Sequence, residues 1–147
     1  MMSIEKAAPC DFEVLAALWE ASVRATHDFL CEADINYFRT AVEQEYLYHV
    51  DVYALKREAG DFSGFIGIAG DKIEMLFIHP DDFGKGYGAR LMRFAVDDLG
   101  ATKVDVNEQN TAATGFYLSK GFRVVGRSET DGLGKPFPLL HMELHTK

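Results

Sequence analysis

The chain has 147 residues, of which 48% are hydrophobic and 26% are charged. These values suit one globular domain spanning residues 1–147 and exclude a disordered or fibrous chain. The formal net charge of −8 argues against a nucleic-acid partner, because a nucleic-acid binder carries a basic face.

The N-terminal residues lack the apolar core of a signal peptide, and no stretch has the length of a membrane span. Cys10 and Cys31 stand alone in the sequence, without a Cys-x-x-Cys pattern. We therefore expect a reduced cytoplasmic protein with no membrane partner.

Hydrophobic periodicity and turn residues predict eleven regular elements. In chain order they are a strand at 4–7, helices at 11–27 and 34–46, strands at 50–56, 62–69 and 72–79, a helix with its apolar stripe at Leu91, Ala95 and Leu99, a strand at 102–106, a helix at 111–120, and strands at 122–127 and 138–145. The order β-α-α-β-β-β-α-β-α-β-β predicts a mixed α/β domain.

A glycine-rich loop joins the strand at 72–79 to the helix that follows it. Gly84, Gly86 and Gly88 leave the backbone bare, so successive N–H groups can surround an anion, and the helix adds its positive dipole end. The pattern predicts a phosphate cradle, although glycines also serve tight turns that bind nothing.

Two sequence blocks together resemble the GNAT superfamily of acyl-CoA-dependent N-acetyltransferases, of the small single-domain bacterial type. They are LFIHPDDFGKGYG at 76–88 and NEQNTAATGFYLSKGF at 107–122. The resemblance implies the GNAT fold, a mixed central β-sheet flanked by helices. It also implies transfer of an acetyl group from acetyl-CoA to a primary amine of a small molecule, a protein lysine or a protein N-terminus, by direct attack in a ternary complex. Phe83 departs from the pattern, since the family usually shows Arg or Gln at that position.

The same resemblance implies the cofactor-binding residues. The backbone of Gly84, Lys85, Gly86, Tyr87, Gly88 and Ala89 would hold the pyrophosphate, and Leu76, Phe77 and Ile78 would pair with the pantetheine arm. Asn110 would contact that arm, or it would instead cap the helix that follows. Tyr117 would donate a proton or a hydrogen bond to the departing thiolate.

The general base is less determined by the sequence. Glu74 is our preferred candidate because it is a charge in an otherwise apolar strand. Asp105, His27 with Asp28, and a water chain remain open. We expect no metal site, since only His27 and Cys31 share a helical spacing and a metal needs three or four ligands.

Two alternatives belong to other classes of protein. One is a GNAT-like sensor that binds acyl-CoA without turnover, which the departure at Phe83 favours. The other is a small dinucleotide-binding domain, because Gly84-x-Gly86-x-x-Ala89 fits that fingerprint and Asp105 follows about 20 residues later. The sequence does not identify the amine acceptor, and it allows a monomer or a homodimer.

Overall fold

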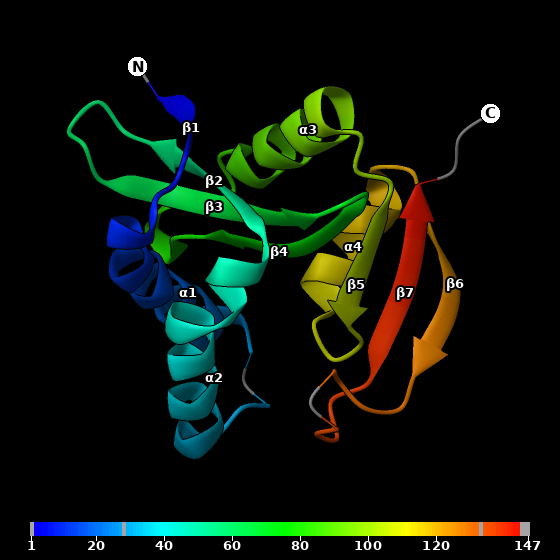
Figure 1. The fold of residues 1–147 in the computed structure, drawn as a ribbon. Coiled ribbons are helices and arrows are strands. Elements are labelled where there is room, and N and C mark those ends of the chain that lie inside the picture. Colours follow the sequence, from blue (N-terminus) through cyan, green and yellow to red (C-terminus); the bar gives the residue numbers. More distant parts are fainter. Residues whose placement is uncertain (1, 28, 133, 145–147) are drawn as a thin grey trace. The chain divides into compact units, whose positions relative to one another are not determined.

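A computed structural model describes residues 2–27, 29–132 and 134–144 of the chain. Its internal contacts divide the chain into two units, Met1–Ala101 and Thr102–Lys147, which are described separately below (Figure 1). No helix within the described residues combines the length and the apolar character needed to cross a membrane.

The first unit is an antiparallel sheet with helices on both faces. Its elements are β1 (Ser3–Lys6), α1 (Phe12–Thr26), α2 (Glu32–Gln44), β2 (Asp51–Lys56), β3 (Phe62–Ala69), β4 (Lys72–Ile78) and α3 (Tyr87–Leu99). The strands lie in the order β1-β2-β3-β4, so neighbours in sequence are neighbours in the sheet. Short connections favour this antiparallel arrangement.

Each face of this sheet is buried by its own helices. On one face, Trp19 of α1 packs edge-on against Phe77 of β4, with ring centroids 6.3 Å apart. On the other, Phe94 of α3 packs against Tyr53 of β2 at 5.0 Å. Side chains alternate along a strand, which explains why β2 serves both layers: Val52 and Ala54 join the core under α1 while Tyr53 faces α3.

The second unit is a three-stranded antiparallel sheet with one helix. It contains β5 (Lys103–Asn107), α4 (Thr111–Ser119), β6 (Phe122–Ser128) and β7 (Leu139–Leu144), and β7 lies in the centre between β5 and β6. Tyr117 of α4 packs against Phe122 of β6, with ring centroids 5.4 Å apart.

The observed order of strands and α-helices confirms the predicted one. The second helix differs in its bounds, because it begins at Glu32 and ends at Gln44. The Cys31 N–H donates to the Asp34 carboxylate, which fixes the earlier start. Tyr46, predicted to close that helix, begins a separate 3₁₀ turn, Tyr46–His49. The last strand ends at Leu144, and its predicted final residue, His145, lies outside the described residues.

Candidate active site

The predicted phosphate loop begins where β4 ends. His79 leaves the strand with extended backbone and caps a 3₁₀ turn, Pro80–Asp82, by accepting a hydrogen bond from the Asp81 N–H at its Nδ1, 3.2 Å away. Proline at the first position of this turn lacks the N–H that a helical turn leaves unpaired. The turn reverses the chain and delivers it to the glycines.

Gly84 and Gly86 both adopt left-handed backbone, with φ of +80° and +81°. Glycine adopts this region without the steric cost that a side chain would add. Apart from the adjacent residues of the chain, no heavy atom of the described structure would lie within 4 Å of a Cβ built on either glycine, so the space beside the loop is open. Gly88 lies inside α3 with ordinary helical backbone, so two of the three predicted glycines shape the loop.

The N-terminus of α3 completes an anion-binding geometry. Its first internal bond runs from the Arg90 N–H to the Gly86 carbonyl, 3.1 Å away, so the N–H groups of Tyr87, Gly88 and Ala89 precede the helical ladder. Gly86 has no side chain to cap them. Backbone donors and the helix dipole therefore meet beside an open space, which fits the pyrophosphate of acetyl-CoA.

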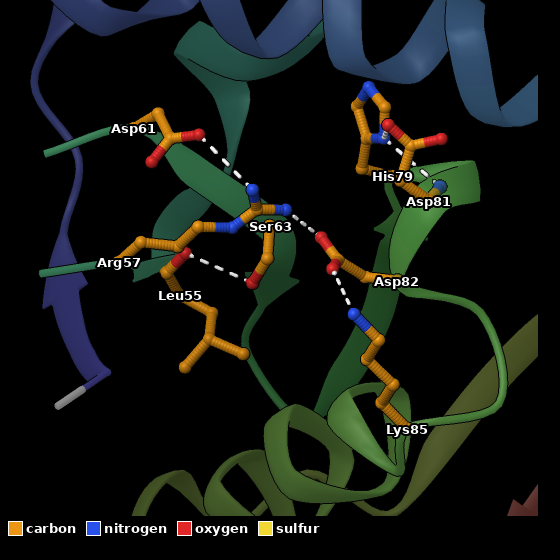
Figure 2. A network of polar contacts seen from close by, with 8 residues as sticks. All are labelled: Leu55, Arg57, Asp61, Ser63, His79, Asp81, Asp82 and Lys85. Carbon is orange, nitrogen blue, oxygen red and sulfur yellow. Dashed lines mark hydrogen bonds and ion pairs between the residues drawn. The ribbon is translucent and has the colours of Figure 1, made fainter. Parts of the chain in front are cut away.

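A buried carboxylate anchors this loop to the β2–β3 hairpin (Figure 2). The Asp82 side chain is only 6% exposed and accepts hydrogen bonds from Arg57 Nη2 and from Lys85 Nζ, the latter at 3.1 Å. Arg57 also donates to Asp61 at 3.2 Å across the hairpin turn. Sequence analysis identified neither Arg57 nor Asp82, because the pair joins positions 25 residues apart.

Two cations near Phe83 in the sequence, Lys85 and Arg90, both have partners other than a ligand. Lys85 is paired with Asp82, and Arg90 Nη2 donates to the Met2 carbonyl at 3.0 Å. Phe83 itself is an exposed side chain. If this loop binds phosphate as predicted, the attraction would come mainly from the backbone.

Glu74 lies at an irregularity in β4. The pairing with β3 steps from Ile68↔Ile73 to Gly67↔Met75, so Glu74 is the extra residue of a bulge. It is exposed and lies 3.7 Å from Lys72 Nζ. Because a strict alternation of faces does not extend across a bulge, the alternation of β4 does not place Glu74 on the same face as Leu76 and Ile78.

The structure shows how Tyr117 and Asn110 are held within the second unit. Tyr117 is buried on α4, and this burial raises the pKa of its hydroxyl. Asn110 is the N-cap of α4: its side-chain oxygen accepts a hydrogen bond from the Ala113 N–H, 3.1 Å away. The capping alternative for Asn110 is thus confirmed, and its contact with the pantetheine arm stays a prediction.

The other candidate bases occupy different surroundings. His27 ends α1, and its Nδ1 lies 2.7 Å from the Thr26 hydroxyl, while its neighbour Asp28 lies outside the described residues. Asp105 lies in β5, with its carboxylate 2.7 Å from His141 Nδ1. His141 was not a sequence candidate, since a histidine in a strand has no distinguishing local pattern. Across the described ranges, no group of three or more His, Cys, Asp or Glu side chains could hold a metal ion.

Comparison with known proteins decides the family. The family model described as an acetyltransferase (GNAT) domain matches residues 27–145. The chain belongs to the GNAT acetyltransferase family. It is 39% identical over 145 residues to the peptidyl-lysine N-acetyltransferase YjaB of Salmonella typhimurium, which covers 97% of each chain.

Two solved structures give the same answer for the fold of this acetyltransferase. The solution structure of apo YjaB from Escherichia coli matches with a TM-score of 0.90 and 37% identity, covering 100% of this chain and 99% of the other. The PaiA N-acetyltransferase of Thermoplasma acidophilum, solved with coenzyme A, matches with a TM-score of 0.77 and 21% identity over 99% of each chain. Family membership rejects the dinucleotide-binding alternative. The protein is an acetyltransferase, and acetyl-CoA is its co-substrate.

Proposed function

We propose that this acetyltransferase transfers the acetyl group to the side-chain amine of a lysine in a protein, by direct attack within a ternary complex. One observation carries the proposal: a left-handed glycine turn opens onto the N-terminus of α3 in a chain that is similar, over 97% of its length, to an enzyme named for peptidyl-lysine acetylation. Both units together, residues 1–147, would form the single catalytic domain.

The cofactor would be held by backbone groups of the first unit. The N–H groups of the loop and of the first turn of α3, from Gly84, Lys85, Gly86, Tyr87, Gly88 and Ala89, would bind the pyrophosphate. Leu76, Phe77 and Ile78 of β4 would pair with the pantetheine arm, as the family resemblance implies. Asn110 would contact the same arm while it caps α4.

Tyr117 would stabilise the leaving thiolate by a hydrogen bond. An ordinary phenol has a pKa of ~10 and a thiol ~8.5, so complete proton transfer from Tyr is uphill by about 2 kcal/mol. Burial raises the pKa of Tyr117 and so increases this gap. A neutral phenol that donates a hydrogen bond without surrendering its proton is the role that this environment favours.

The remaining roles follow from exposure and chemistry. Glu74 is the sequence candidate for accepting the proton of the lysine ammonium, with Asp105, His27 and a water chain as the alternatives. Two exposed free cysteines agree with a reduced, cytoplasmic setting. A monomer or a homodimer would serve the reaction equally.

The proposal is tested by calorimetric titration with acetyl-CoA, followed by turnover with a lysine peptide whose N-terminus is blocked. Release of the CoA thiol is measured with a thiol reagent, and the acetylated lysine is located by mass spectrometry. We expect binding, and thiol release that depends on the peptide. Binding without turnover would favour the sensor alternative, and acetylation of an unblocked N-terminus alone would overturn the choice of lysine.

A further inference from the structure

A groove that is open to solvent lies between the ends of two helices of the first unit. Its volume is about 560 Å³, within the range of about 300–1,000 Å³ that ligand sites occupy. The start of α1, the end of α2 and the turns beside them supply its walls, and all of them belong to the first unit. The lining residues include Cys10, Phe12, Glu13, Glu43 and Tyr48. We call this cavity the helix-end groove.

The aromatic wall of the helix-end groove is anchored in the core. Phe12 is 6% exposed, and the ring of Tyr48 packs nearly perpendicular to it, with centroids 4.9 Å apart. Leu47, the neighbour of Tyr48, is fully buried. Tyr48 is nevertheless 59% exposed. An aromatic ring that is fixed by the core and open to water gives a ligand a preformed surface to contact.

Two carboxylates border the groove without a cationic partner. Among the described residues, neither Glu13 nor Glu43 forms an ion pair or a side-chain hydrogen bond. Glu43 is half-buried and Glu13 is exposed. The described residues that line the groove include no Lys, Arg or His. The groove therefore presents negative charge that the surrounding side chains do not compensate.

The end of α2 adds to this negative potential. The last bond of the helix runs from the Glu45 N–H to the Ala41 carbonyl, 2.9 Å away, so the carbonyls that follow have no helical partner. They carry the negative end of the helix dipole. The last turn contains no basic residue, and Glu43 within it opposes the dipole. This arrangement is unfavourable for the helix alone, and a bound cation would offset it.

An anion is the alternative ligand, because the N-terminus of α1 also borders the groove. The dipole of α1 would attract negative charge there. Asp11 and Glu13 already place two carboxylates at this helix start, and Asp11 accepts a hydrogen bond from the Ala8 N–H at 2.9 Å. The positive end of α1 is thus compensated by side chains, whereas the negative end of α2 is not. The balance of charge favours a cation.

We propose that the helix-end groove binds an arginine side chain of a basic polypeptide; the inference goes beyond the proposed function, because binding here needs no acetyl transfer. A guanidinium suits both kinds of group in the groove, since it stacks on an aromatic ring such as Tyr48 and donates paired N–H groups to a carboxylate such as Glu43. A lysine ammonium is more strongly hydrated and lacks the planar face. The net charge of −8 adds long-range attraction for a basic partner.

The test uses the full chain and a blocked peptide of alternating arginine and glycine, which contains no lysine. At low ionic strength, NMR titration should show shifts concentrated at residues 9–13 and 43–48, with a Kd of about 0.1–1 mM. A peptide with citrulline in place of arginine keeps the shape without the charge and should not bind. Glu43→Gln should raise the Kd about threefold. Asp98→Asn removes an exposed carboxylate elsewhere in the first unit, and as the matched control it should leave the Kd unchanged.

Cysteine alkylation gives an independent measure of where the peptide binds. Cys10 lines the groove, whereas Cys31 is an exposed thiol at the N-cap of α2, the opposite end of that helix. The arginine peptide should slow the alkylation of Cys10 severalfold and leave that of Cys31 unchanged. Mass spectrometry distinguishes the two sites, so Cys31 serves as an internal control in every sample.

The possible outcomes are distinct. A peptide that does not bind, or that leaves the alkylation of Cys10 unchanged, would overturn the inference. Equal binding of the citrulline peptide, or an unchanged Kd in a Glu43→Gln variant whose thermal unfolding is normal, would overturn its electrostatic basis. Tighter binding of spermidine than of the arginine peptide would replace the polypeptide by a free polyamine. None of these measurements depends on turnover, so failure of the proposed function would be seen separately, in the lysine-peptide assay.

Discussion

The buried carboxylate of Asp82 offers a direct measure of how the phosphate loop is stabilised. Asp82→Asn keeps the shape of the side chain but removes the charge that Arg57 and Lys85 share. Hydrogen bonds to charged groups contribute about 1.5–3 kcal/mol each when shielded, and pairs with an exposed partner about 0–1 kcal/mol. Because the Arg57 side chain is 34% exposed and Lys85 53%, we expect the free energy of unfolding to fall by about 2–3 kcal/mol.

Asp61→Asn is the matched control, since it removes another carboxylate from the same guanidinium. Asp61 is 59% exposed, so its loss should cost no more than about 1 kcal/mol. Urea unfolding at neutral pH and low salt measures both variants, and an unchanged m-value would show that the unfolded state is unaffected. Equal losses in the two variants, or a loss below about 0.5 kcal/mol in Asp82→Asn, would refute the anchoring role of Asp82.

Three further predictions concern the cofactor and the leaving group. Phe83→Arg should lower the Kd for acetyl-CoA about fivefold at low ionic strength, because it adds a positive charge at an exposed position of the loop. Salt at about 0.5 M, which screens surface charge, should remove the gain in affinity. An equal effect of Phe83→Gln would contradict this electrostatic explanation. Gly88→Ala should stabilise α3 by up to about 0.5 kcal/mol yet weaken acetyl-CoA binding. Gly86→Ala should lower both the stability and the affinity for acetyl-CoA, because Gly86 has left-handed backbone. Urea unfolding measures the stability and calorimetry the affinity, and unweakened binding in both variants would argue against the phosphate cradle. Tyr117→Phe should lower kcat by about ten- to a hundredfold. Because burial raises the pKa of Tyr117, its contribution to the free energy of unfolding is complete below the unfolded-state pKa of ~10 and is lost as the pH rises above that value. Tyr117→Phe should therefore lose less stability than the wild type in urea unfolding above that pH. Parallel losses in the two proteins would disprove the burial argument.

Local periodicity was sufficient to predict the order of elements and several of their bounds. The strand at 62–69 and the glycine stop at Gly100 follow from residue type alone, since glycine at a left-handed C-cap and alternating apolar residues act locally. The 3₁₀ turn at Pro80–Asp82 and the bulge at Glu74 were not predicted. The bulge depends on the register between β3 and β4, and a single sequence carries little information about register. The 3₁₀ turn has the local causes Pro80 and the His79 cap, but a Pro after a strand fits several kinds of turn.

In the candidate site too, the residues that could be predicted from the sequence are those with a local pattern. The glycine loop and Tyr117 lie in contiguous blocks, so their spacing was visible in the sequence. Arg57 with Asp82, and His141 with Asp105, meet only after β-pairing brings together residues 25 and 36 positions apart. A charged side chain in a strand most often belongs to a solvated face, and a different role can be recognised only when the structure shows which side chain it contacts.

Side-chain charge alone does not make the loop attractive to a pyrophosphate. In the network of Figure 2, three carboxylates accompany two cations: Asp61, Asp81 and Asp82 with Arg57 and Lys85. A local excess of negative charge would repel the anion, so we expect the favourable contribution to pyrophosphate binding to come from backbone N–H groups and the dipole of α3. The charges of Arg57 and Lys85 are instead directed at Asp82, where they fix the turn that aims those N–H groups. Replacing Gly86 should therefore cost more acetyl-CoA affinity than replacing Lys85, even though Lys85 carries the formal charge.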